Sequence, residues 1–213
     1  MRPPRAAKTK PAYRQPVRRL HFGAGNIFRG FIAALQQRLL DAGLAGEGII
    51  AADTFDGEII ERICAPFDCL TMNVTPNPDA TTEREIIASI AEGVRADTAD
   101  KQCRARLAEI FSQPTLQMVS FTITEKGYQL RGMNGELLPV AKSDMSAGPD
   151  AARHAMSVVT AMLLERFRAG AQPIALVSVD NCSRNGERLR AAVLEIARMA
   201  GKRICRTGLC GLH

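Results

Sequence analysis

Gly23 and Gly25 stand two positions apart in the segment LHFGAGNIFRGF, residues 20–31, between an apolar run and a stretch of helix-compatible residues. A strand over residues 17–22 that enters such a turn would place Gly23 where the chain bends tightly. Gly25 would let the backbone approach a phosphate without a Cβ in the way, and the free N–H groups of a following helix would attract that phosphate. The pattern predicts a dinucleotide site, although a plain structural turn or another nucleotide ligand also fits these residues.

A carboxylate follows the next predicted strand. Asp53 ends the apolar run at residues 48–53, where it can accept hydrogen bonds from ribose hydroxyls. It favours NAD over NADP, because it would repel a 2′-phosphate. Phe28 occupies the usual position of a third glycine, so the helix must contact the strand differently from the common motif. An adenosylmethionine-dependent methyltransferase stays open, because that class also has a Gly-rich first turn and a ribose-binding acid.

Polar residues follow two later apolar runs. Thr124 ends one predicted strand and Lys126 follows it, and Asp180 and Asn181 come after another. The carboxyl ends of parallel strands meet at one edge of a sheet, and ligands of open α/β sheets bind there. Ordinary loop roles fit as well, because Asp180 and Asn181 suit helix N-caps and Lys126 suits a solvated loop.

The elements that must position these residues alternate along the chain. Strands are predicted at residues 17–22, 48–53, 70–75, 85–90, 116–124 and 173–179, and helices at 27–40, 101–111, 150–169 and from 187 onward. Asn134-Gly135 predicts a hairpin within residues 128–139. We expect His21 in the core and His154 on the surface of a helix. Alternating strands and helices indicate an α/β fold, here a Rossmann-type, doubly wound and mostly parallel sheet.

Composition restricts the class of protein. Residues 1–19 hold seven of the 28 Lys and Arg residues and no acid, so the rest is nearly neutral with 21 basic and 22 acidic residues. We interpret residues 1–16 as a disordered basic leader, with an interaction arm as the alternative, and predict no nucleic-acid partner. No apolar run approaches a membrane span of about 18–20 residues, and no signal-peptide core is present, which predicts a cytoplasmic protein without a membrane partner. Six irregularly spaced cysteines and three histidines predict no metal site.

Three motifs together resemble the polyol-specific long-chain dehydrogenases, which are the mannitol dehydrogenase family with the fructuronate and tagaturonate reductases. They are LHFGAGNIFRGF, TITEKGY at 122–128 and VSVDNCSRNG at 177–186, in the family's order. The resemblance implies an NAD-dependent oxidoreductase that transfers hydride between NAD(H) and a small-molecule substrate, a sugar alcohol or a keto-uronic acid. The residues carried over to the cofactor site are Gly23, Ala24, Gly25, Asn26, Ile27, Asp53, Thr124 and Lys126.

The resemblance also implies roles on the substrate side. Asn181 would donate a hydrogen bond to the reacting carbonyl oxygen as charge develops on it. Asp180 and Asn185 would bind substrate. Val179 stands where family members commonly have cysteine.

One expected feature is missing from the sequence. The family resemblance implies a helical C-terminal domain with a Lys-x4-Asn-x2-His signature, whose lysine is the general acid and base, and no such spacing occurs in these 213 residues. The alternative function is therefore an isolated dinucleotide-binding domain without turnover. We interpret residues 17–198 as the NAD-binding domain and 199–213 as an irregular tail. Our hypothesis is that a frameshift near Arg198 truncated a longer dehydrogenase and produced this tail, and a genuine short protein is the alternative. The face that an absent C-terminal domain would leave uncovered predicts self-association.

Overall fold

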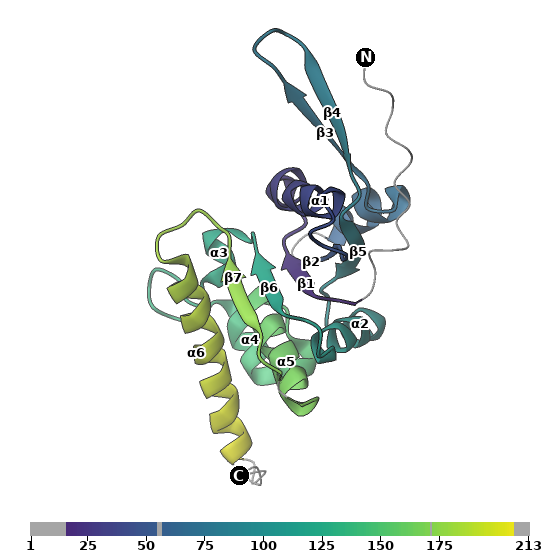
Figure 1. Ribbon diagram of the computed structural model, residues 1–213. Coiled ribbons are helices and arrows are strands. Elements are labelled where there is room, and N and C mark those ends of the chain that lie inside the picture. The colour runs from purple at the N-terminus through teal and green to yellow at the C-terminus, as the bar shows by residue number, and fades with distance from the viewer. Residues whose placement is uncertain (1–15, 55–56, 171, 207–213) are drawn as a thin grey trace. The chain divides into compact units, whose positions relative to one another are not determined.

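The computed structural model describes residues 16–54, 57–170 and 172–206, with side chains up to residue 201 (Figure 1). The chain forms two compact units. The first contains the described residues up to Arg95 together with Thr115–Thr122, and the second contains Ala96–Pro114 and the described residues from Ile123 onward. The chain therefore leaves the first unit after Arg95, returns for one strand, and leaves it again after Thr122.

Four parallel strands form the centre of the first unit: β1 (Arg19–Phe22), β2 (Ile49–Asp53), β5 (Ile90–Arg95) and β6 (Met118–Phe121). They lie side by side in the order β5-β2-β1-β6. The chain moves outward from β1 to β2 and β5, and then returns to β6 on the other side of β1. The carboxyl ends of β1 and β6 therefore flank a topological switch point, which is where open α/β sheets bind ligands.

Helices in the first unit cover this sheet. A single turn of π-helix, η2 (Phe28–Ile32), continues directly into α1 (Ala33–Asp41), and a second π-helix, η3 (Ile59–Cys64), precedes the short 3₁₀-helix η4 (Ala65–Phe67). The predicted helix over 27–40 is confirmed, but it begins with a wider turn than an α-helix has. The buried side chains that join these helices to the strands are Ala24, Phe28, Ala33, Ala34, Ile49, Ala51, Ile60, Cys64, Cys69, Ile87 and Ile90.

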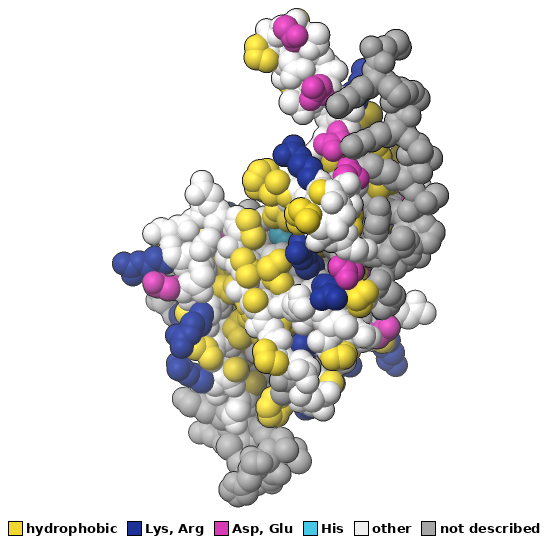
Figure 2. All heavy atoms as spheres, in the orientation of Figure 1, with side chains coloured by type: hydrophobic (Ala, Val, Ile, Leu, Met, Phe, Trp, Pro, Cys, Tyr) yellow, Lys and Arg dark blue, Asp and Glu magenta, His cyan; other side chains and the backbone are white. Residues whose placement is uncertain are grey.

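An antiparallel hairpin completes the first unit. It consists of β3 (Thr71–Pro76) and β4 (Thr82–Ile87). The strand predicted over 85–90 is wrong as one element, because β4 ends and β5 begins inside it. Between them Ala88 donates its N–H to the side chain of Gln37, so the backbone changes partners there. Figure 2 shows that hydrophobic side chains also reach the surface of the molecule.

The second unit is mainly helical. Its elements are α2 (Lys101–Ser112), α3 (Thr124–Tyr128), α4 (Pro139–Ala147), η5 (Pro149–Ala151), α5 (Ala155–Arg168), β7 (Ala175–Ser178) and α6 (Asn185–Arg206). Helix α5 contacts both α2 and α6, and α6 also contacts β7. The buried guanidinium of Arg166 in α5 donates to the carbonyls of Phe111 and Gln113 at 2.7 and 2.9 Å. It satisfies carbonyls at the end of α2 that the helix leaves without partners.

Helix α5 begins later than predicted, because His154 caps it. The His154 side chain is only 5% exposed, so the expected surface position is wrong. The Nδ1 of His154 accepts the backbone N–H of Met156 at 3.2 Å, and the backbone N–H of His154 donates to the Asp144 carboxylate at 2.9 Å. The predicted hairpin within 128–139 is reduced to a single bridge between Arg131 and Leu137.

The ends of the chain bear on the predicted domain boundaries. Helix α6 continues to Arg206, so the backbone stays helical beyond residue 199, where the irregular tail was expected to begin. The basic leader up to residue 15 and residues 207–213 lie outside the described residues. Across the described part of the chain, no helix is long and apolar enough to cross a membrane. Nor does that part contain a group of three or more His, Cys, Asp or Glu residues that could hold a metal ion.

Candidate functional site

The glycine turn follows β1 at the switch point of the first unit. Gly23 adopts a φ of +101°, and a Cβ added to it would lie 2.2 Å from the carbonyl oxygen of Thr122. Its N–H donates to the carbonyl of Ala52 at 2.8 Å, which ties the turn to the end of β2. Only glycine combines this φ with such close backbone contact. Gly23 is therefore required by the fold itself.

Gly25 has a different status. Its φ lies outside the left-handed region, and an added Cβ would have no neighbour within 4 Å. Nothing in its surroundings therefore excludes a side chain. A glycine that the fold does not require, at the start of a helix and at a switch point, leaves open space where a ligand phosphate can approach the backbone. The turn thus has room for a pyrophosphate next to its backbone.

Phe28 explains how the chain dispenses with the third glycine. Its side chain is fully buried, and its ring stacks on the imidazole of His21 with centroids 4.3 Å apart and planes inclined by 9°. The π-helix that starts at Phe28 widens the turn that contacts the strand. The expected departure from the common helix–strand contact is confirmed. Asn26 and Ile27, which precede Phe28, are exposed.

Asp53 lies beside the glycine turn, as the sequence predicts. The Asp53 side chain ends β2 and is 7% exposed. Its Oδ2 accepts the backbone N–H of Ala24 at 3.0 Å. The structure therefore brings together the predicted residues Gly23, Ala24 and Asp53 within one unit. A carboxylate held here can accept ribose hydroxyls next to a phosphate on the turn.

In the second unit, Asp180 organises the loop that follows β7. Its carboxylate accepts the N–H groups of Ile123 and Thr124, each at 3.0 Å, and the hydroxyl of Tyr128 at 2.6 Å. Tyr128 also shares a hydrogen bond of 2.8 Å with Ser178. Burial, followed by the hydrogen bond to Asp180, raises the pKa of the Tyr128 hydroxyl. Asp180 therefore fixes the start of α3 in this unit.

Thr124 is held in a backbone conformation that a β-branched residue rarely adopts. Its φ is +65°, and its N–H is bound by Asp180. Such strain costs about 1–3 kcal/mol and persists only where the surroundings impose it. Thr124 and the exposed Lys126 line a surface pocket of about 570 Å³ together with Glu125 and Gln129.

The two asparagines of the VDNCSRNG segment have different surroundings. Asn185 starts α6, and its amide donates to the carbonyl of Asp180 at 2.8 Å, so this side chain holds the loop closed. Asn181 is exposed on that loop. Of the predicted polar residues of this unit, Thr124, Lys126 and Asn181 are thus exposed. Asp180 and Asn185 instead hold backbone groups in place.

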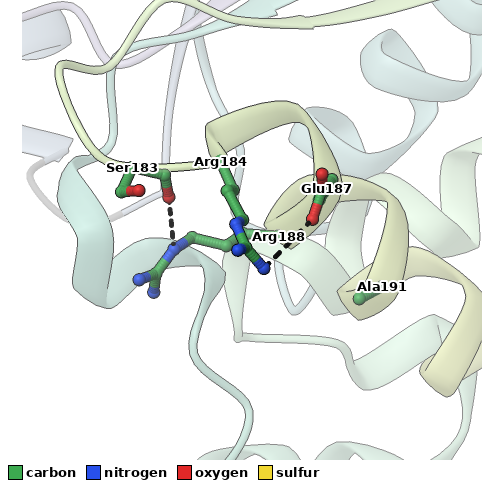
Figure 3. A pocket seen from close by; sticks show the side chains of 5 residues that line it. All are labelled: Ser183, Arg184, Glu187, Arg188 and Ala191. Carbon is green, nitrogen blue, oxygen red and sulfur yellow. Dashed lines mark hydrogen bonds and ion pairs between the residues drawn. The ribbon is translucent and has the colours of Figure 1, made fainter.

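A pocket that sequence reasoning did not identify opens beside this loop (Figure 3). It has a volume of about 510 Å³ and is lined by Ser183, Arg184, Glu187, Arg188 and Ala191. Arg188 donates to the carbonyl of Ser183 at 2.9 Å and pairs with Glu125 at 2.7 Å. Arg184 lies 4.0 Å from Glu187. Because the guanidinium groups face carboxylates, the pocket has no uncompensated positive charge to attract an anion.

A parallel α/β sheet with a glycine turn at its switch point and an acid at the end of the next strand defines a Rossmann-type nucleotide-binding domain. Residues 17–206 match the model of the mannitol dehydrogenase Rossmann domain, and the chain belongs to the mannitol dehydrogenase family. This assignment confirms the resemblance carried by the three motifs. It also disfavours the adenosylmethionine-dependent alternative that the glycines alone left open.

Individual relatives agree with the family assignment. D-mannonate oxidoreductase of Thermotoga maritima is 46% identical over 178 residues, which are 84% of this chain and 33% of the relative. D-arabinitol 4-dehydrogenase of Ralstonia nicotianae is 33% identical over 85% of this chain and 39% of the relative. A solved ternary complex of Pseudomonas fluorescens mannitol 2-dehydrogenase with NAD and D-mannitol superposes with a TM-score of 0.77 at 27% identity, covering 93% of this chain and 40% of that chain. This chain therefore spans between 33% and 40% of the length of these relatives.

Proposed function

We propose that this chain is the NAD-binding part of an oxidoreductase that transfers hydride between NAD(H) and a sugar alcohol or a keto-uronic acid. The observation that carries the proposal is the glycine turn, where Gly25 leaves open space and Asp53 is fixed beside Ala24. The similarity to a D-mannonate oxidoreductase at 46% identity favours the acid over the polyol as substrate.

The residues of this chain divide the work as follows. The Gly23–Ile27 turn receives the pyrophosphate, and the Asp53 carboxylate accepts the hydroxyls of the adenosine ribose. From the family resemblance, we assign Thr124 and Lys126 to the cofactor as well. Asn181 donates a hydrogen bond to the reacting carbonyl oxygen, where a donor stabilises developing negative charge. Asp180 and Asn185 act at the substrate side by holding the loop that carries Asn181. Bound NAD(H) supplies or accepts the hydride.

A second candidate is dinucleotide binding without turnover. It requires only the glycine turn and Asp53, which the first unit holds together. General acid–base catalysis, which typically contributes about 10²–10⁴ in rate, is needed for turnover but not for binding. Adding fructuronate, tagaturonate or fructose to the NADH-loaded chain separates the two candidates, because oxidation of NADH is expected only from the first.

Calorimetric titration of the purified chain with NADH tests the binding function that both candidates share. We expect binding by the unsubstituted chain, weaker binding by Asp53→Ala, and little binding of NADPH because of the charge at Asp53. Asp53→Asn retains an acceptor for the Ala24 N–H and removes the negative charge. It is therefore expected to reduce the difference in affinity between NADH and NADPH. Asp79→Ala, an exposed carboxylate of the β3–β4 hairpin, controls for net charge. Failure of the folded, unsubstituted chain to bind NADH would contradict the proposal.

A further inference from the structure

One peptide group of the glycine turn is held at both ends by side chains. The carbonyl of Gly23 and the N–H of Ala24 belong to the same peptide. The hydroxyl of Thr122 donates to that carbonyl at 3.2 Å, and Asp53 accepts that N–H at 3.0 Å. The orientation of this peptide is therefore set from both sides, by the residue after β6 and by the last residue of β2.

The Thr122 hydroxyl is itself held by a buried histidine. His21 lies in β1 with no exposed surface, as expected of a core residue. Its Nε2 lies 2.8 Å from Thr122 Oγ1, and its Nδ1 lies 2.7 Å from Ser120 Oγ. On its flat side the ring stacks against Phe28, the first residue of the π-helix. Both ring nitrogens of His21 thus have hydrogen-bond partners, and one face of the ring is stacked.

The directions of these hydrogen bonds follow from the number of protons available. Thr122 has one hydroxyl proton and donates it to Gly23, so its oxygen must accept from Nε2–H of His21. In the neutral imidazole Nδ1 is then an acceptor, and Ser120 donates to it. Burial lowers the pKa of His21 to about 3, so the ring is neutral at physiological pH. The relay, defined as Ser120, His21 and Thr122, therefore ends at the Gly23 carbonyl.

Filling a core position with such a relay costs more free energy of burial than filling it with an apolar side chain. Buried polar groups cost free energy unless each is satisfied, whereas an apolar side chain would fill the space without that requirement. Glycines, moreover, leave a turn many accessible conformations, and fixing one of them before the ligand arrives lowers the cost of binding.

We propose that His21 is a positioning residue for the cofactor: with Ser120 and Thr122 it holds the 23–24 peptide so that the glycine turn is preformed for the pyrophosphate. This inference rests on the proposed binding of NAD(H), but it concerns residues other than those assigned to the cofactor above.

The test compares two substitutions of Thr122 and one control. Thr122→Val has nearly the same shape but no hydroxyl, so it breaks the relay at its last bond, whereas Thr122→Ser retains that bond. Ser89→Ala removes another buried hydroxyl of the same unit, which donates to the Ala33 carbonyl at 2.6 Å and not to the turn. Each variant is titrated with NADH and unfolded in urea.

The expected result separates stability from binding. Thr122→Val and Ser89→Ala both lose stability, but only Thr122→Val weakens NADH binding, by about tenfold. Thr122→Ser stays within about threefold of the unsubstituted chain. Equal NADH affinity of Thr122→Val and the unsubstituted chain would overturn the inference, as would an equal loss of affinity in Ser89→Ala. Absence of NADH binding by the unsubstituted chain would instead overturn the proposed function, and the role of the relay with it.

A second measurement does not depend on the cofactor. The ¹⁵N chemical shifts of the imidazole report which ring nitrogen carries the proton. The relay requires the proton on Nε2 of His21, and it requires this tautomer to persist from pH 8 to pH 5. A proton on Nδ1 would mean that Thr122 donates to the ring and not to Gly23, which would overturn the inference.

Discussion

The glycine turn of the first unit and the loop after β7 in the second unit differ in how their predicted site residues are used. In the turn, Gly25 has open space around it, and the side chains that shape the turn come from neighbouring strands. In the loop, Asp180 and Asn185 bind backbone groups of their own unit. Some residues of a motif are therefore required by the fold, and others are available to a ligand. Substitutions distinguish the two kinds of residue, because only the substitution of a residue that the fold requires should lower the free energy of unfolding.

The two glycines of the turn give the largest contrast. Gly23→Ala places a Cβ 2.2 Å from a backbone oxygen at a φ of +101°, so we expect it to lose about 4 kcal/mol of unfolding free energy or more. Gly25→Ala meets no neighbour, so stability is expected to stay within about 1 kcal/mol. NADH affinity should nevertheless fall at least tenfold in Gly25→Ala. Urea unfolding and calorimetry check both values, and a Gly25→Ala variant that binds NADH normally would contradict the pyrophosphate assignment.

Asp180 should behave as a structural residue of the second unit. Asp180→Ala leaves the N–H groups of Ile123 and Thr124 and the hydroxyl of Tyr128 without their acceptor, at a cost of about 3 kcal/mol. Asp150→Ala is the matched control, because its 75%-exposed carboxylate pairs with Arg104 at the surface and should cost less than about 1 kcal/mol. Urea denaturation of both variants measures the difference. Equal small losses would contradict the structural role assigned to Asp180.

What the sequence could predict follows the range of the interactions involved. The turn, its flanking strands and Asp53 were predictable, because glycine spacing and apolar runs are local signals. The cap of α5 was not, because His154 is fixed by Asp144 ten positions earlier and by Gln129 on another segment. The bond between His21 and Thr122 spans 101 positions, and no local pattern indicates it. The boundary between β4 and β5 was missed because both strands are short and apolar where they meet.

The same limit applies to the loop after β7. Its polar residues were identified correctly as a cluster at a strand end, but the sequence alone could not divide them by role. That division depends on where each side chain finds a partner. Asp180 finds backbone N–H groups near Thr124, more than fifty positions earlier, whereas Asn181 is exposed. Folding, and not the motif, decides which of two adjacent polar residues is left for chemistry.

Among the described residues, each unit buries one histidine, and the pH dependence of stability should reflect this. Burial lowers the pKa of His21 to about 3 and also lowers that of His154. The unfolded chain takes up protons below about pH 6.5 that the folded chain refuses, so stability is lost as pH falls through that value and is unaffected above it. For His21 the loss is about 2 kcal/mol between pH 7 and pH 5. Urea unfolding at several pH values should show that the free energy of unfolding falls less between pH 7 and pH 5 in His21→Gln than in the unsubstituted chain. The same pH dependence in both proteins would contradict the assignment of a neutral His21.

The smallest expected effect concerns the surface of the first unit. Three apolar side chains lie at intervals of four residues along η2 and the start of α1. They are Ile27, Phe31 and Leu35, which are 67%, 60% and 43% exposed. Residues four apart share a helix face, so these side chains form an apolar stripe, which favours association with a second copy of the chain. Phe31→Ser should weaken concentration-dependent association in light scattering and change stability by less than about 0.5 kcal/mol. Leu44→Ser, at a residue 76% exposed outside the stripe, should leave association unchanged. If the unsubstituted chain is a monomer at all concentrations, the prediction of association through the stripe is wrong.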